Sequence, residues 1–444
     1  MTVTSWAALI LVSSVTVILI MIALKMPRFL AKIRAMKNLF KNKKISLVVV
    51  LFAALILHLF IAFQFEATGD SGGWRLAGIT GLHGGQLGMG NGTVYDGDCP
   101  LLCSNWPPLT YHYYIAMRWL YENVNPLQWP HWGYNKLLPV LSTVGIAYLL
   151  YKYALLFKAR QPLFLSALYA FHPLSLYVSA YHGQRESVWL FFLLLSLYVW
   201  LKYKQYFLFA ILFAISVSVK IPPLLLAPFL LLSLPTIKSK LGFILIVPFV
   251  FFTLNLPEIV TYKENVFKQV FFYGGEVGWW GFSAVAVKID VLTGTSISNI
   301  VASSSKALQY IAVILGSIYF YRKKFNAFEG LLGILMIVFV FSSIFAPQYM
   351  LWPLPFMVLL YNKYKKLLLI YSISAAYAAM NVYGIFGIRF IEYLLVNLPQ
   401  TYIYYKIPHL TYPLDLYFPL WIVSVLFLIS IIQNGGAYVK RRKK

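Results

Sequence analysis

The segment FEATGDSGGWR, residues 65–75, opens the longest part of the chain that is not plainly membrane-spanning. This part runs from Glu66 to Asn135 and includes CPLLCSNWPPLTYHYYIAMRW at residues 99–119. It holds both cysteines, a dense set of glycines and four acids before residue 99. Because long apolar runs flank it on both sides, we predict a polar loop between two membrane spans.

The composition is that of a membrane protein. The chain is 60% hydrophobic and 11% charged, and its mean hydropathy is +0.73. A net charge of +24 would suggest nucleic acid as the partner of a soluble protein. Here the basic residues stand between apolar runs, so the positive-inside rule explains them and we expect no nucleic-acid partner.

The apolar runs predict about thirteen transmembrane helices. The basic segment MPRFLAKIRAMKNLFKNKK, residues 26–44, is assigned to the cytoplasm, and alternation then places the loop 65–136 outside. Every loop assigned to the inside carries basic residues, and of the 13 acids only Glu329 falls there. The predicted spans lie near residues 5–24, 45–64, 137–157, 163–181, 186–201, 206–220, 222–236, 241–256, 307–321, 326–345, 350–362, 367–388 and 415–433.

Three parts follow from this topology. Residues 1–44 form an accessory N-terminal transmembrane helix and a basic cytoplasmic loop. The first run is interpreted as a retained helix rather than a signal peptide, because it is long and no basic region precedes it. Residues 45–360 form the membrane core, with the outer loop 65–136, and residues 361–444 form C-terminal transmembrane helices and a basic cytoplasmic tail.

Asp70 is the candidate catalytic residue of the outer loop. Glycines surround it and allow backbone to approach a ligand closely, and Arg75 is placed to pair with a phosphate or with Asp70. The alternative is an exposed loop carboxylate. Farther along, Pro107 and Pro108 predict a helix start with Asn105 as its cap, followed by an aromatic, amphipathic segment typical of a membrane interface.

Further candidates lie on turns predicted to be outside. AYHGQRESVW, residues 180–189, brings Arg185 and Glu186 close to a membrane helix, where ionisable groups are usually functional. A glycine turn with solvated charges is the alternative. Lys220 ends an outward-running helix, where a cation also complements the helix dipole.

Two late outer segments complete the set. FFYGGEVGWWGFSAV, residues 271–285, is rich in glycine and tryptophan and offers a sugar-stacking surface. FAPQYMLWPLP, residues 345–355, offers Gln348 and Tyr349 as polar donors. All of these motifs fall on one side of the membrane, which predicts a single outward cavity.

Several established chemistries have no motif in this chain. We find no phosphate-cradling Gly-Lys-Ser/Thr loop, no His-Glu-x-x-His and no Gly-x-Ser-x-Gly elbow. Asp96, Asp98 and His83 lack ligand spacing on a regular element. We therefore predict neither a metal nor another cofactor. The two cysteines, Cys99 and Cys103, are equally consistent with a disulfide and with free thiols.

The motifs resemble those of the GT-C superfamily, whose multi-span glycosyltransferases use polyprenyl-phosphate sugars. The lipid-linked-oligosaccharide glucosyltransferases have Gly-Asp-x-x-x-x-Arg in the first outer loop, matched here by Gly69, Asp70 and Arg75. Their later Tyr-Pro-Pro-Leu-Thr-x-Tyr-His element is similar to residues 106–112, with Trp106 in place of tyrosine. The turn at Gln348 is more similar to prokaryotic GT-C mannosyltransferase-like proteins. The resemblance covers roughly residues 45–360.

The resemblance implies an inverting hexosyltransferase with its active site on the extracytoplasmic side, in a prokaryotic plasma membrane or the endoplasmic reticulum. Asp70 would be the base, and the leaving phosphate would need a cation. The donor would be a polyprenyl- or dolichyl-phosphate-linked glucose or mannose, and the acceptor a lipid-linked or envelope glycan. The candidate substrate-binding residues are Arg75, Trp106, Tyr111, His112, His182, Gln184, Arg185, Glu186, Lys220, Gln348 and Tyr349.

Two other classes stay open from the sequence. A transporter or lipid flippase would explain many spans and polar groups, although transporters usually place their site at the membrane midplane. A non-catalytic assembly subunit of an envelope-glycan system is the third class. Sugar transfer from a synthetic polyprenyl-phosphate hexose separates the enzyme from both.

Overall fold

The computed structural model describes residues 43–66, 70–83, 107–261, 270, 280–382 and 413–434. Within these ranges every regular element is a helix and no strand occurs. The predicted all-helical architecture is confirmed for this part of the chain. The first predicted span, the two cysteines and Trp106 lie outside the described residues.

Several described helices are long and apolar enough to cross a membrane, which indicates a membrane protein. Among the described residues there are six, or seven if one pair bent by 47° counts as a single span. The six are Ile45–Gln64, Leu137–Leu156, Glu186–Tyr203, Ile237–Leu254, Ile297–Arg322 and Tyr417–Asn434, and the bent pair is Pro162–Ala170 with Pro173–His182. The count of thirteen stays a prediction, because helices such as Tyr206–Val219 are shorter.

The helices group into two compact units. The N-terminal unit contains α3 (Lys43–Gln64), α4 (Asp70–His83), α5 (Leu109–Asn123), α6 (His131–Asn135), α7 (Leu137–Leu156), α8 (Pro162–Ala170), α9 (Pro173–Ser175), η1 (Leu176–His182), α10 (Glu186–Tyr198), η2 (Val199–Tyr203), α11 (Tyr206–Val219), α13 (Ile237–Leu254) and α14 (Leu256–Thr261). The C-terminal unit contains α12 (Ala227–Ser233), α16 (Gly281–Thr293), α17 (Ile297–Arg322), α18 (Ala327–Phe341), η5 (Pro347–Leu351), α19 (Leu354–Leu359), α20 (Tyr361–Val382) and α23 (Pro413–Asn434). The short helix η3 (Pro222–Leu226) lies at the boundary, and the predicted domain boundaries after residues 44 and 360 stay predictions.

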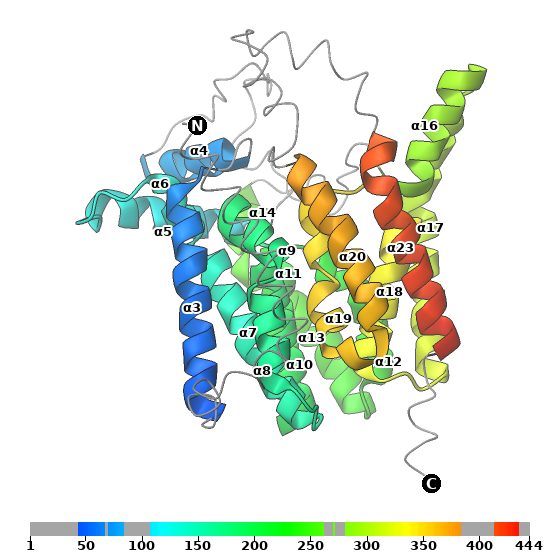
Figure 1. Cartoon of the computed structure of the whole chain (residues 1–444), viewed down its shortest axis with the longest axis horizontal. Coiled ribbons are helices and arrows are strands. Elements are labelled where there is room, and N and C mark those ends of the chain that lie inside the picture. The colour runs from blue at the N-terminus through cyan, green and yellow to red at the C-terminus, as the bar shows by residue number, and fades with distance from the viewer. Residues whose placement is uncertain are drawn as a thin grey trace, which may run out of the picture. The chain divides into compact units, whose positions relative to one another are not determined.

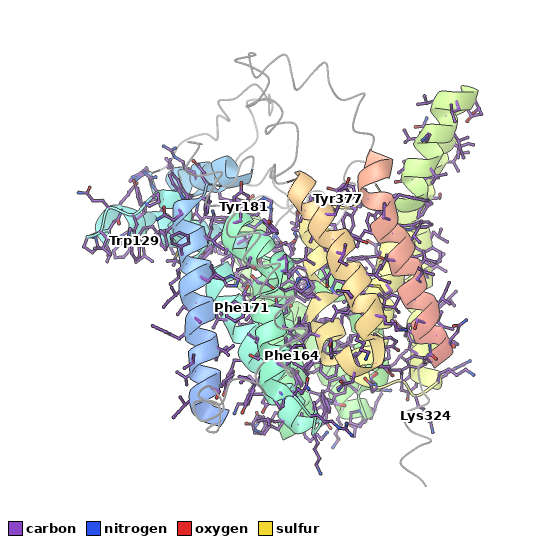
Figure 2. All side chains as sticks on the ribbon, viewed as in Figure 1. Trp129, Phe164, Phe171, Tyr181, Lys324 and Tyr377 are labelled. Carbon is purple, nitrogen blue, oxygen red and sulfur yellow. The ribbon has the colours of Figure 1, made fainter. Side chains whose placement is uncertain are left out.

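Three helices of the predicted outer loop gather at the end of α3 where Gln64 lies (Figure 1). Helix α4 packs along α5, and α6 contacts both of them as well as α3. A glycine makes the α4–α5 contact close, because a Cβ at Gly78 would lie 2.9 Å from the Tyr114 carbonyl oxygen. The side chain of Trp129, in the segment between α5 and α6 (Figure 2), lies against Phe63 at that same end of α3, with ring centroids 4.4 Å apart and planes tilted by 47°.

Helix α5 begins directly after Pro107 and Pro108, as predicted. Residues far along the chain accept hydrogen bonds from its first turn. The Leu109 N–H donates to Asn255 Oδ1 at 2.9 Å, and the Thr110 hydroxyl donates to the Val219 carbonyl at 3.1 Å. Asn255 follows α13, and Val219 is the last residue of α11. The predicted cap Asn105 lies outside the described residues. These two bonds fix the start of α5 against the ends of the candidate span α13 and of the shorter apolar helix α11.

In the C-terminal unit, an ion pair joins residues that the charge pattern assigned to the same side. Glu329 lies in the first turn of α18, where the Asn326 side chain accepts from its N–H at 3.0 Å. The Lys363 ammonium donates to the Glu329 carboxylate. Glu329 was the single acid predicted to be inside, and Lys363 belongs to a basic loop predicted to be inside.

Candidate functional site

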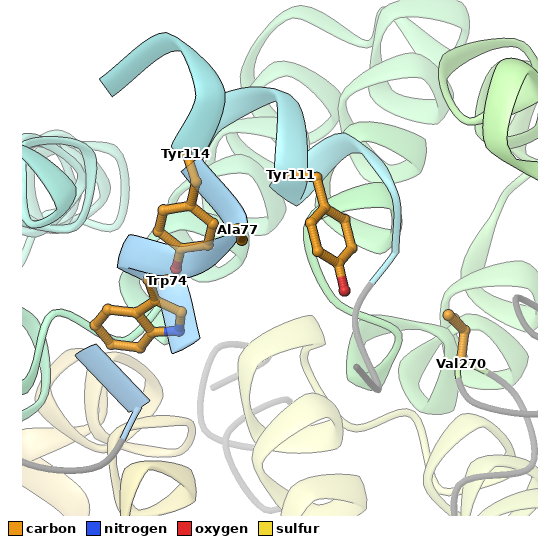
Figure 3. Close-up of a cluster of buried hydrophobic side chains, with 5 residues drawn as sticks. All are labelled: Trp74, Ala77, Tyr111, Tyr114 and Val270. Atoms are coloured by element: carbon orange, nitrogen blue, oxygen red, sulfur yellow. The ribbon is translucent and has the colours of Figure 1, made fainter. Parts of the chain in front are cut away.

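Helix α4 contains most of the GDSGGWR motif, and its Trp74 belongs to a buried aromatic cluster. Asp70 is the first residue of α4, one helical turn before Trp74, so positions 70 and 74 share a face of the helix. Trp74 is fully buried and stacks on Tyr114 of α5, with ring centroids 5.7 Å apart and planes 8° apart. Figure 3 shows these two rings beside Ala77. The side chain of Asp70 lies outside the described residues.

Arg185 is enclosed by this cluster. Its side chain is 2% exposed, and its guanidinium lies 5.8 Å from the Trp74 ring centroid and 5.2 Å from that of Tyr114. The guanidinium also donates to the Tyr114 hydroxyl. A cation over aromatic faces gains cation–π attraction, which increases when water is excluded. The sequence had left a solvated turn open as an alternative, but this charge is buried.

The neighbouring residue Glu186 is also buried and forms an ion pair. The Lys220 ammonium donates to its carboxylate, and the two side chains are 9% and 0% exposed, respectively. Lys220 directly follows α11, whose last carbonyl is bound by Thr110 of α5. The structure therefore brings Lys220, the 180–189 turn and the start of α5 together in one unit.

The turn that presents Arg185 requires glycine at position 183. Gly183 ends the π-helix η1 with φ of 78° and ψ of 24°, a left-handed conformation that disfavours side chains. A Cβ at this position would also lie 2.5 Å from Lys136 Cγ and 3.3 Å from Trp74 Cζ3. Beside it, the Gln184 amide lies 3.2 Å from His182 Nε2, and the His182 ring stacks on Trp74 at 5.8 Å.

Other predicted residues of the outer loop lie apart from the guanidinium. Tyr111 is buried in the same aromatic cluster, but its ring lies farther along α5 toward Val270 (Figure 3). His112 and Arg75 are exposed. Trp106 lies outside the described residues. Arg75 was the preferred partner of the phosphate in the sequence-based mechanism, and the structure places it at an exposed position of α4.

The two late outer segments meet in the C-terminal unit. Trp280 stacks on Phe345 with centroids 3.7 Å apart, and the Ser283 hydroxyl donates to the Ser343 carbonyl at 2.6 Å. Tyr349, one of the predicted donors, is partly buried, with its ring 4.2 Å from that of Trp352. Gln348 precedes it on η5 and is likewise partly buried.

Lys136, which lies between α6 and α7, is a buried charged residue that was not among the predicted site residues. Its side chain is fully buried, its ammonium donates to the Phe65 carbonyl at the end of α3, and it lies 5.9 Å from the Tyr181 ring centroid. Burial lowers the pKa of Lys136 to about 7, partly opposed by the charge of Glu66. A signal was present in the sequence, because a lysine just before an apolar run on the outer side runs against the charge pattern.

No metal site is formed by the residues that the structure describes, since no three His, Cys, Asp or Glu side chains among them converge. His83 instead binds the Glu122 carboxylate at 2.8 Å, and Arg118 binds the other oxygen of the same carboxylate. Asp96 and Asp98 lie outside the described residues.

In comparisons with known proteins, no family model matches this chain and no curated protein matches it. The evidence on function therefore comes from the site itself. Its main features are a buried guanidinium within an aromatic cluster, a buried ammonium–carboxylate pair and the helix that begins with Asp70.

Proposed function

We propose that the chain is an inverting glycosyltransferase that moves a hexose from a polyprenyl-phosphate donor to a lipid-linked or envelope glycan on the extracytoplasmic side of a membrane. One observation supports this most: motifs from four separate segments meet around Arg185, Glu186 and Lys220. Cations that are partly shielded from water suit a phosphate leaving group, because electrostatic stabilisation is strongest where the dielectric is low.

In this mechanism Asp70 takes the proton of the acceptor hydroxyl as that oxygen attacks the anomeric carbon. The bond between the anomeric carbon and the phosphate oxygen breaks, and the bonding electrons leave with the polyprenyl phosphate. The transition state has oxocarbenium character, as in other glycosyl transfers. Attack from the face opposite the leaving group inverts the anomeric configuration.

Arg185 and Lys220 are assigned to the leaving phosphate. An arginine matches two phosphate oxygens with its fork of N–H donors, and a lysine adds a point charge. Because Arg185 is 2% exposed, a donor phosphate reaches it only when the packing of Trp74 and Tyr114 opens. We therefore expect donor binding to displace α4, which carries both Trp74 and Asp70.

The decisive experiment replaces the proposed base. Asp70→Asn should keep expression and donor binding but lower hexose transfer from a synthetic polyprenyl-phosphate donor by at least ~100-fold, the scale of a positioned base. Asp290→Asn is the matched control, because Asp290 is a partly exposed acid that accepts from the Ile297 and Ser298 N–H groups at the start of α17. An Asn variant at position 70 with near-normal turnover would remove this residue from the mechanism.

The phosphate assignment has its own test. Arg185→Gln should weaken donor binding about 10-fold or more, because a charge-assisted pair is lost at a shielded site. Arg118→Gln is the control, since Arg118 pairs with the exposed Glu122 on α5. Equal donor affinity in both variants would reassign the phosphate to other residues.

A transporter is the second candidate, and one feature favours it. The bent pair Pro162–Ala170 and Pro173–His182 ends at the site, and transporters often bind substrates at interrupted helices. Uptake of a lipid-linked sugar into proteoliposomes without any hexose transfer would support the transporter. Transfer by the purified chain in detergent, where no compartment exists, would support the enzyme.

A further inference from the structure

Lys136 is a charged residue buried beside the aromatic cluster, and burying its ammonium costs free energy. Its side chain is fully buried between the end of α3, the ring of Tyr181 and the backbone of Gly183. Removing an ammonium from water is expensive, and a methionine of similar length would fill the space without that cost. This position therefore calls for a role beyond filling volume.

The contacts of Lys136 join two parts of the proposed site. Its ammonium binds the Phe65 carbonyl, where the backbone leaves α3 five residues before position 70. Its methylene stem lies against Gly183, which in turn lies under Trp74. Phe65 and Tyr181 also approach each other, with ring centroids 6.2 Å apart. One side chain thus bridges the end of α3 and the turn that presents Arg185.

We infer that Lys136 is a positioning residue of this site, which holds the end of α3 to the 182–186 turn and so sets where α4 lies. A cation at the end of a helix binds its last carbonyls and complements its dipole. The inference rests on the proposed function for its consequence in catalysis, but the positioning itself is independent of what the site does. Lys136 acts through α4 and does not touch the substrate.

The test is Lys136→Met, with Lys152→Met as the matched control. Lys152 lies on α7, the helix that begins directly after Lys136, with its ammonium 5.3 Å from the Tyr148 ring centroid and its side chain partly exposed. In Lys136→Met we expect the hexose-transfer kcat to fall 10- to 100-fold, because a small misplacement of a catalytic group is costly. The donor KM should change less than threefold, and thermal stability at pH 7 should not fall.

This pattern separates positioning from the two other possible roles. A purely structural role predicts a lower melting temperature together with lower activity. A direct phosphate contact predicts a raised donor KM. Either outcome, or a kcat equal to that of the control, would overturn the inference.

A measurement without turnover keeps the inference apart from the proposed function. Hydrogen–deuterium exchange of amides in α4 should be at least threefold faster in Lys136→Met than in the wild type, and unchanged in Lys152→Met. Unaltered exchange in α4 overturns the positioning role even if the chain proves to be a transferase. Faster exchange in a chain that transfers no sugar would retain the positioning role and reject the enzyme. If Lys136→Met does not fold, Lys136→Leu, which also lacks a donor for the Phe65 carbonyl, serves in its place.

Discussion

At the scale of single residues, the buried pair of Lys220 and Glu186 makes a sharp prediction about stability. Both side chains are almost completely shielded from water, so removing one partner leaves an uncompensated charge. We expect Lys220→Met to lower the free energy of unfolding by about 3–5 kcal/mol. The double variant Lys220→Met with Glu186→Gln should recover most of this loss, as measured by thermal unfolding in detergent.

The double variant should recover stability but not donor binding. If Lys220 binds the donor phosphate, the double variant folds but binds donor weakly, which separates the two roles of the lysine. A double variant as unstable as the single one would mean that the pair does not stabilise the fold through its charges.

Lys136 predicts how stability depends on pH. Burial lowers its pKa to about 7, whereas the unfolded chain keeps a value near 10.5. Between these pH values the unfolded state binds more protons, so the free energy of unfolding rises with pH; below pH 7 the burial penalty is fully present. The melting temperature of the wild type should therefore rise relative to Lys136→Met between pH 7 and 9. A difference that is constant over this range would contradict the shift.

The site residues that could be predicted from the sequence are charged residues that stand next to an apolar run. Arg185 and Glu186 stood beside an apolar run, and both are buried at the cluster. Arg75 was also a candidate binding residue, chosen for its place in the glycine-rich motif, but it is exposed. Sequence spacing fixes which helix face a residue occupies, but burial depends on what other segments pack there. Lys136 was missed for that reason, because its partners lie on α3 and η1.

At the scale of elements, the contact of α4 with α5 depends on a small residue. A Cβ at Gly78 would lie 2.9 Å from the Tyr114 carbonyl oxygen and 3.0 Å from Arg118 Cβ. We expect Gly78→Ala to cost about 1–3 kcal/mol, the usual cost of overpacking, and to lower transfer activity by moving α4. Gly242→Ala on α13 is the control, because its Cβ would meet only Ile246 Cδ1 at 3.8 Å. A Gly78→Ala variant as stable as the control would show that α4 can shift freely.

The helix elements themselves were predictable to different degrees. The apolar run of α3 gave a helix with nearly the predicted bounds, because a run of twenty residues in which only Ser46, His58 and Gln64 are polar leaves few alternatives. The π-helical turn η1 was not predictable, since it depends on Gly183 and the side chains packed around it. The hydrogen bond between Asn255 and the start of α5 could not be predicted either, because Asn255 is 146 residues away in sequence from Leu109.

At the scale of the whole molecule, the charge pattern predicts which ends face the cytoplasm. Asn123 belongs to the predicted outer loop and Gln205 to a turn predicted to be inside, and both are exposed. In a Cys99→Ser, Cys103→Ser background, Asn123→Cys should react with an impermeant thiol reagent added to intact cells. Gln205→Cys should react only after the membrane is opened. Labelling of both from one side would reject the alternating topology.

The Asn255 side chain has a consequence for how the protein is made. A chain grows from its N-terminus, so the ribosome has finished α5 long before it adds residue 255. Until then the Leu109 N–H lacks the amide oxygen that it binds in the folded protein. A nascent chain arrested shortly before Asn255 should therefore leave α5 open to protease attack, and one arrested well beyond it should not.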